Sequence, residues 1–158
     1  MSFEARGRCS APREFVMKMQ IRLISQGEID SVLRIQARCY GADFQESGAA
    51  FLGKLAAFPR GAVGVFANGE MVGYVFCFPW ARGEAVPLNG AGLDHCRPKD
   101  CLYIHDLAVL PHMRGAACSR ALVEHVRRLA ADEGLDAFAL VAVQEAAHYW
   151  RRWGFVER

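Results

Sequence analysis

The residues best suited to chemistry lie in one stretch, residues 101–121, which reads CLYIHDLAVLPHMRGAACSRA. His105 and Asp106 interrupt an otherwise apolar run over residues 102–110, and Pro111 ends it. This composition predicts a strand that is buried on both faces. An imidazole exchanges protons near neutral pH and a carboxylate can accept one, so the strand carries candidate acid–base groups.

Small residues follow this strand and lead into a helical pattern: Arg114, Gly115, Ala116, Ala117, Cys118, Ser119 and Arg120. The first amides of a helix have no carbonyl partners, and the helix dipole adds about half a positive charge there. The pattern therefore predicts a binding site for a phosphate-bearing ligand on residues 114–120.

The hydrophobic pattern predicts the elements that must position these residues. Strands are expected at residues 20–24, 63–67, 70–78, 102–109 and 137–143, and helices at residues 25–40, 47–58, 117–133 and 145–153. A last strand is expected to begin just before Arg158. The order β-α-α-β-β-β-α-β-α-β predicts an α/β fold with one mixed sheet and helices on both faces.

Local signals mark several boundaries of these elements. Ser25 and Glu28 have the spacing of a capping box, and Asn68-Gly69 is typical of a tight hairpin turn. Pro79 is expected to end the third strand because proline cannot donate to a sheet ladder. Residues 80–100 are predicted to be a functional or mobile loop. This loop holds three further candidates for acid–base chemistry, Glu84, Asp94 and His95.

Length and composition indicate an ordinary soluble protein. The chain has 158 residues, of which 53% are hydrophobic and 23% charged. We expect a flexible leader at residues 1–18 and a single domain over residues 19–158. The net charge of +2 is too small to indicate a nucleic-acid partner.

Several other classes of protein are not expected. No run of 18 apolar residues is present, so we expect no membrane association. Six cysteines are scattered singly, which favours free thiols and a cytoplasmic location. No Cys and His spacing is typical of a zinc site, so no metal is expected.

Two motifs resemble those of the GNAT N-acetyltransferase superfamily. Residues 109–115 (V-x-P-x-x-R-G) are similar to its acetyl-CoA motif, whose core loop is usually Arg/Gln-x-x-Gly-x-Gly/Ala. Residues 146–155 (A-x-x-Y-W-x-x-x-G-F) resemble its second motif, commonly Ala-x-x-Phe-Tyr-x-x-x-Gly-Phe. The two motifs occur in the family's order, and the resemblance spans roughly residues 19–158.

The resemblance implies a fold, a cofactor and a reaction. The strands at 102–109 and 137–143 are expected to splay into a V that holds the pantetheine arm of acetyl-CoA. The backbone of Leu107, Ala108 and Val109, residues 114–120 and the ring of Trp150 are the implied cofactor contacts. The implied reaction moves an acetyl group to a primary amine, by direct attack in a ternary complex. We expect a small-molecule acceptor, and a monomer or a homodimer.

The implied proton acceptor is His105. The segment His105-x-Leu107-Ala108-Val109 resembles the His-x-Leu-Ala-Val strand of arylalkylamine N-acetyltransferases, where the histidine takes part in removing the amine proton. A second histidine of that family corresponds to Tyr103, which is expected on the same strand face. Asp106 is the second candidate, expected on the opposite face because side chains alternate along a strand.

The chain also departs from the family pattern. Trp150 stands where a tyrosine usually protonates the leaving thiolate, and Tyr149 lies about 100° around the helix. Either solvent protonates the thiolate, which we favour, or a local distortion brings Tyr149 into place. Ala117 and Ser119 replace small residues that let the backbone approach a pyrophosphate. Alternatives are a CoA-binding module without transferase activity, and an acetyltransferase for protein N-termini or lysines.

Overall fold

The computed structural model describes residues 17–90, 98–115 and 117–158. Asp94, His95, Ala116 and most of the expected leader lie outside these ranges. The chain runs through β1 (Met19–Leu23), α1 (Ile29–Cys39), α2 (Gly48–Ala57), β2 (Ala62–Ala67), β3 (Glu70–Trp80), β4 (Cys101–Val109), α3 (Ala117–Asp132), β5 (Phe138–Leu140) and α4 (Ala147–Arg151). Four short 3₁₀ turns accompany these elements.

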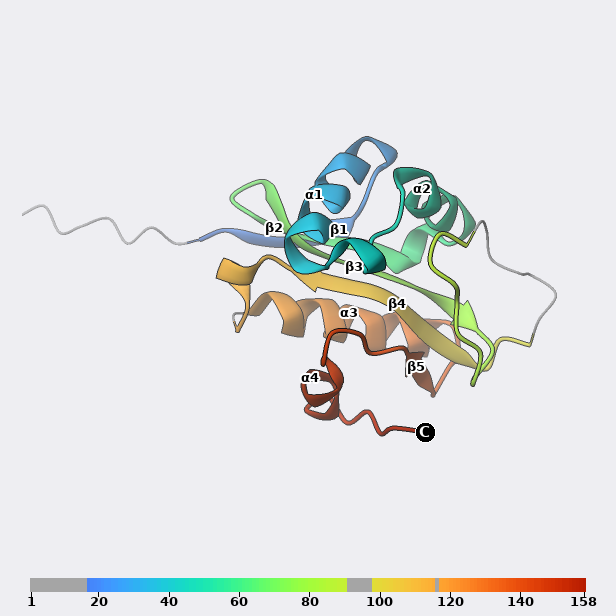
Figure 1. Cartoon of the computed structure of the whole chain (residues 1–158). Helices are drawn as coiled ribbons and strands as arrows, with labels where there is room; N and C mark the ends of the chain where they lie inside the picture. Colours follow the sequence, from blue (N-terminus) through green and yellow to red (C-terminus); the bar gives the residue numbers. More distant parts are fainter. Residues whose placement is uncertain (1–16, 91–97, 116) are drawn as a thin grey trace, which may run out of the picture.

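The predicted mixed sheet with helices on both faces is confirmed. The strands lie in the order β1-β2-β3-β4-β5. The first three pairings are antiparallel and β4 pairs with β5 in parallel. The helices α1 and α2 cover one face, and α3 and α4 lie on the other (Figure 1). None of the helices in the described part of the chain is long and apolar enough to cross a membrane.

Each face of the sheet has its own apolar core. Under α1 and α2, Phe51 packs on Tyr74 and Phe76 of β3, with ring centroids 6.0 and 4.9 Å away. Under α3, Leu122 and Val126 are buried in a second cluster that includes residues of β3 and β4. Because both faces are covered, β4 is almost wholly apolar, as the sequence predicts for a central strand.

Short-range signals position several ends of these elements. The capping box is present, and the Ser25 amide donates to Glu28 Oε2 at 2.9 Å. Asn68 and Gly69 have φ angles of 51° and 87°, as a tight hairpin turn between β2 and β3 requires. Lys18, expected in the leader, donates its backbone N–H to Asn68 Oδ1 at 3.2 Å, and its carbonyl accepts the backbone N–H of Asn68 at 2.9 Å.

Three boundary predictions are wrong. Pro79 lies within β3, opposite Leu102, whose N–H turns away to bond the carbonyl of Ala137. The proline ring is tolerated because this position of the ladder requires no N–H from β3. The strand β5 ends at Leu140 instead of residue 143. The last predicted strand is absent, because residues 155–158 adopt no regular structure in the described chain.

The strand β4 contains a bulge at His105. Phe76 of β3 pairs with Asp106, and the next residue, Cys77, pairs with Ile104, so His105 is the extra residue. A bulge of this kind bends its strand and changes the direction of the side chains around it. The bulge therefore decides which way the candidate acid–base groups point.

Candidate active site

The predicted opening between β4 and β5 begins beside the bulge. The two strands pair only from Leu102 to Ile104 on β4, opposite Phe138–Leu140 of β5. From His105 onward β5 no longer covers this edge of β4. The Leu107 carbonyl accepts the Tyr40 hydroxyl at 2.9 Å, and the Val109 carbonyl accepts Arg114 Nε at 3.1 Å. This edge, where the pantetheine arm is expected, therefore lies outside the ladder, and both carbonyls bond side chains in this structure.

The loop before α3 has the open character that a pyrophosphate needs. Gly115 has a φ of 76°, and no atom outside its chain neighbours lies within 4 Å of the position of a Cβ. Ala117 and Arg120 are exposed, and Ser119 is half-buried. The first turn of the 16-residue helix α3 thus presents its free amides on an accessible side. These residues fit the phosphates of acetyl-CoA.

The side chains of two residues predicted to contact the cofactor, Cys118 and Arg114, point away from the start of α3. The Cys118 side chain is fully buried in the core under α3, so only its backbone amide is available to a ligand. The Arg114 side chain turns back along β4 to the Val109 carbonyl. The Arg114 side chain therefore lies beside the open edge of β4 at Val109 and not over the start of α3.

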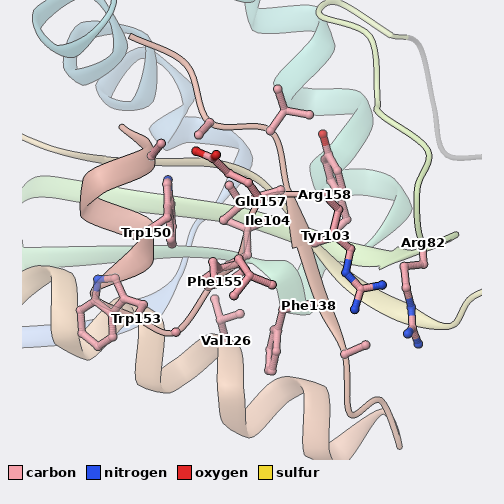
Figure 2. Close-up of a pocket in the computed structure, with 18 of the residues that line it drawn as sticks. Arg82, Tyr103, Ile104, Val126, Phe138, Trp150, Trp153, Phe155, Glu157 and Arg158 are labelled. Atoms are coloured by element: carbon pink, nitrogen blue, oxygen red, sulfur yellow. The ribbon is translucent and has the colours of Figure 1, made fainter. Parts of the chain in front are cut away.

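Trp150 lies at the wall of a hollow of about 1310 Å³ around β5, which is lined by residues of α3, of α4 and of the segment 82–85 after β3. Figure 2 shows Trp150 projecting from α4, Trp153 from the turn after it, Phe138 from β5, and Val126 from α3. Trp150 is 8% exposed and packs edge-on against Phe155 at 5.3 Å. Of the sequence-predicted site residues, the described lining of this hollow includes Trp150, Tyr103 and the loop candidate Glu84.

His105 lies in a buried row of ionisable side chains. Its Nε2 is 2.8 Å from Glu46 Oε1, and Lys54 Nζ on α2 is 3.1 Å from Glu46 Oε2. The His105, Glu46 and Lys54 side chains are 4%, 2% and 1% exposed. His105 Nδ1 is also buried and has no hydrogen-bond partner among the described residues.

Glu46 remains an anion in this row. Burial acts to raise the pKa of Glu46, but the contacts with His105 and Lys54 outweigh it and lower the pKa. The backbone N–H of Asn89 also donates a hydrogen bond to Glu46 Oε1 at 3.1 Å. The Gln36 side chain fixes the backbone of Glu46 through two hydrogen bonds of 2.8 and 2.9 Å.

The prediction that Asp106 faces away from His105 is wrong. The extra residue in β4 turns both side chains toward α1 and α2, where Asp106 accepts the Tyr74 hydroxyl at 2.6 Å. Burial raises the pKa of Asp106, and the hydroxyls of Tyr74 and Tyr40 oppose that rise. Asp106 is thus part of a tyrosine-bonded cluster within the core on that face.

The two tyrosines of the predicted site have different surroundings. The Tyr103 ring lies 6.2 Å from that of His105, on the same face as predicted, and 5.8 Å from Phe78. The Val86 amide is 3.5 Å from the Tyr103 hydroxyl. The Tyr149 hydroxyl is buried without a hydrogen-bond partner among the described residues, and its ring packs edge-on against Trp150 and Trp153.

Sequence reasoning missed Glu46 and Lys54. One signal for Lys54 was available, since it follows Phe51 by three residues and precedes Leu55 on the buried stripe of α2. A lysine at such a position requires a buried partner. Nothing in the local sequence indicates that Glu46 is this partner, or that His105 shares it. The aromatic residues toward the end of β3, Phe76, Phe78 and Trp80, are buried in the apolar cores.

Comparison with protein families gives one match that covers most of the chain. The sequence model of the acetyltransferase (GNAT) family matches residues 29–155. The match includes both motifs, the α1–α2 region with Glu46 and Lys54, and all of β4. No curated protein gives a significant match to the chain.

Solved structures with the same fold have low sequence identity to this chain. Ard1 from Thermoplasma volcanium has a TM-score of 0.66 at 20% identity, over 87% of this chain and 82% of that protein. The aminoglycoside N-acetyltransferase AAC(6')-Iy in complex with CoA has a TM-score of 0.65 at 17% identity, over 93% and 92%. The GNAT-like decarboxylase GphF in complex with isobutyryl-CoA has a TM-score of 0.65 at 22% identity, over 87% and 72%.

Proposed function

We propose, from the premise that this chain belongs to the acetyltransferase (GNAT) family, that it acetylates a primary amine of a small molecule. Enzymes of this family use acetyl-CoA, and acetyl-CoA is the cofactor of this chain. The cofactor supplies an acetyl group activated as a thioester, and we propose direct transfer to the amine in a ternary complex. The edge of β4 at residues 107–109 would hold the pantetheine arm. The first turn of α3 would hold the phosphates.

We assign the amine proton to His105. An amine must lose a proton to form an amide, so a group beside the acceptor has to take it, directly or through a water molecule. The observation that carries this assignment is the position of His105 on the bulge, next to the end of the β4–β5 pairing at Ile104. One ring nitrogen faces Glu46 and the other is unpartnered in the described structure, as a base requires.

Protonation of the leaving thiolate does not need Tyr149 in this proposal. The Tyr149 ring packs between Trp150 and Trp153, and its hydroxyl is buried. Trp150 offers only an N–H donor in place of the usual phenol. We therefore propose that solvent protonates the thiolate, and that Trp150 packs against the acetyl end of the cofactor.

A small amine is the acceptor that the strand motif favours, because His105-x-Leu107-Ala108-Val109 is similar to the arylalkylamine N-acetyltransferases. The rings of Phe78 and Tyr103 beside His105 agree with an aromatic environment near the acceptor. The solved structures with this fold include enzymes for an aminoglycoside and for alanine of ribosomal protein S18, so the fold does not select the acceptor.

The test is release of free CoA thiol from acetyl-CoA with a panel of arylalkylamines, aliphatic amines, aminoglycosides and peptides. We expect turnover with small amines, and binding of acetyl-CoA without turnover would instead indicate a CoA-binding module. In the active protein, His105→Gln should lower kcat by roughly 10²- to 10⁴-fold and remove the acid limb of the pH–rate profile. His148→Gln, at an exposed histidine on α4, is the matched control. An unchanged profile in His105→Gln would exclude His105 as the base.

A further inference from the structure

Burying the row formed by Lys54, Glu46 and His105 costs free energy, because ionised side chains lose their hydration in the core. The three side chains are at most 4% exposed, and they come from α2, from the residue before its N-cap, and from β4. Well-packed apolar residues at such positions often give equal or greater stability than a buried ion pair. Stability alone therefore does not explain why a lysine and a glutamate are buried behind this histidine.

The arrangement fixes the state of the histidine ring. Among the described residues, the Glu46 carboxylate has three partners. Lys54 Nζ lies 3.1 and 3.4 Å from its two oxygens, and the backbone N–H of Asn89 and His105 Nε2 both bond Oε1. An ionised carboxylate can only accept hydrogen bonds, so Nε2 of the neutral ring must carry the hydrogen. The lone pair of the ring is then on Nδ1, the atom without a partner in the described structure.

We propose that Glu46 is a positioning residue that holds His105 as the Nε2–H tautomer, so that Nδ1 receives the proton of the acceptor amine. Lys54 keeps Glu46 charged in the core. This inference rests on the proposed function, in which His105 is the base. The same division of roles between a buried carboxylate and a catalytic imidazole operates in serine hydrolases, although their nucleophile has no equivalent in this proposal.

The groups that face the ring show which side chain has to be changed to test the proposal. Glu46 lies against His105 from the α2 side with Lys54 behind it, Asp106 is the adjacent residue of β4, and Tyr103 lies two residues earlier. Glu46 is the only one of these groups within hydrogen-bond distance of the ring among the described residues. Loss of its carboxylate should therefore remove the contact that selects between the two tautomers of the neutral ring.

The first experiment measures the tautomer directly, in the full chain labelled with ¹⁵N-histidine and assigned with His105→Gln. Above neutral pH we expect one pyrrole-type signal from Nε2 and one pyridine-type signal from Nδ1. In Glu46→Gln we expect both signals to move toward their average, because the amide accepts from one tautomer and donates to the other. A protonated Nδ1 in the wild-type chain, or signals unchanged by Glu46→Gln, would overturn the proposal.

The second experiment separates positioning from folding. Glu46→Gln should lower kcat by roughly 10- to 100-fold, within the range of general-base catalysis, with little change in KM for acetyl-CoA. It also leaves Lys54 buried without an anion, which destabilises the chain. The double variant Glu46→Gln/Lys54→Met removes both charges, and we expect it to regain stability but not kcat. Recovery of kcat with stability would show that the row is structural and would overturn the proposal.

These outcomes also distinguish the inference from the function on which it rests. If His105→Gln keeps full turnover, the assignment of the base is wrong and the role of Glu46 is overturned with it. If His105→Gln loses the acid limb while Glu46→Gln keeps both kcat and the ¹⁵N signals of His105, the base assignment holds. Only the positioning role is then overturned.

Discussion

At the scale of single residues, Glu28 joins the turn before α1 to the strand β1. Its carboxylate accepts Arg22 Nη2 at 2.7 Å and the Ser25 amide at 2.9 Å. The hydrogen bond from Arg22, assisted by those from Ser25, lowers the pKa of Glu28 to about 2 against the opposing effect of burial. In the unfolded chain the ordinary value of 4.5 applies. The stabilisation is therefore complete above pH 4.5 and is lost as the pH falls toward 2.

We expect Glu28→Ala to lower the free energy of unfolding by about 1 kcal/mol at pH 7, through loss of the cap and of a partly exposed ion pair. The difference from the wild-type chain should be smaller at pH 3.5, where part of the stabilisation is already lost. Urea unfolding at both pH values measures this. Glu124→Ala, at an exposed position of α3, should change little at either pH. A difference for Glu28→Ala that does not depend on pH would contradict the ion-pair account.

For His105 and Asp106, the sequence indicates the chemistry of the side chains but not the directions in which they point. Their types indicate acid–base chemistry and their apolar neighbours indicate a strand, and both inferences use only nearby residues. Their directions depend on the bulge, and a bulge exists only relative to the pairing of β4 with β3. The sequence therefore identified the residues, but strand pairing decided which way they point.

At the scale of elements, Gly61 controls how α2 joins the sheet. It ends the 3₁₀ turn that connects α2 to β2, and a Cβ at this position would lie 1.7 Å from the backbone carbonyl oxygen of Cys77 in β3. A backbone atom of a central strand cannot move aside without breaking the ladder. The close approach of the turn to β3 therefore requires glycine.

We expect Gly61→Ala to destabilise the fold by about 3 kcal/mol, the upper part of the usual range for overpacking. Gly27→Ala, in the 3₁₀ turn before α1, is the matched control because no atom lies within 4 Å of its Cβ position. Thermal or urea unfolding of the two variants measures the contrast. Equal stabilities of the two variants would show that the turn after α2 does not approach β3 as described.

Element boundaries were predictable where local chemistry sets them. The capping box, the Asn68-Gly69 turn and Gly134 at the end of α3 all depend on backbone conformations that few residues adopt. Pro79 and the end of β5 were not predictable in this way, because they depend on which edge of a strand has a neighbour.

At the scale of the whole molecule, acetyl-CoA should bind across the junction of β4 and α3 and stabilise the folded chain. A ligand at about 100 times its Kd adds roughly 2.7 kcal/mol, which raises Tm by about 5–10 °C for a chain of this size. Differential scanning fluorimetry with acetyl-CoA measures the shift. Acetyl phosphate, which lacks the pantetheine arm and the nucleotide, should give none. No shift at millimolar acetyl-CoA would mean that Ala117 and Ser119 prevent binding.

The sequence by itself indicated the family and the mixed sheet, and it predicts residues 114–120 as the cofactor loop. These depend on hydrophobic periodicity, turn residues and two motifs, all of which involve residues close together in the chain. The tertiary structure alone decided that His105 meets Glu46, 59 positions away, and that Lys54 stands behind them. Such a contact depends on how the residue before α2, the helix α2 and a bulged strand pack together. Because packing joins distant segments, no local pattern in the sequence encodes it.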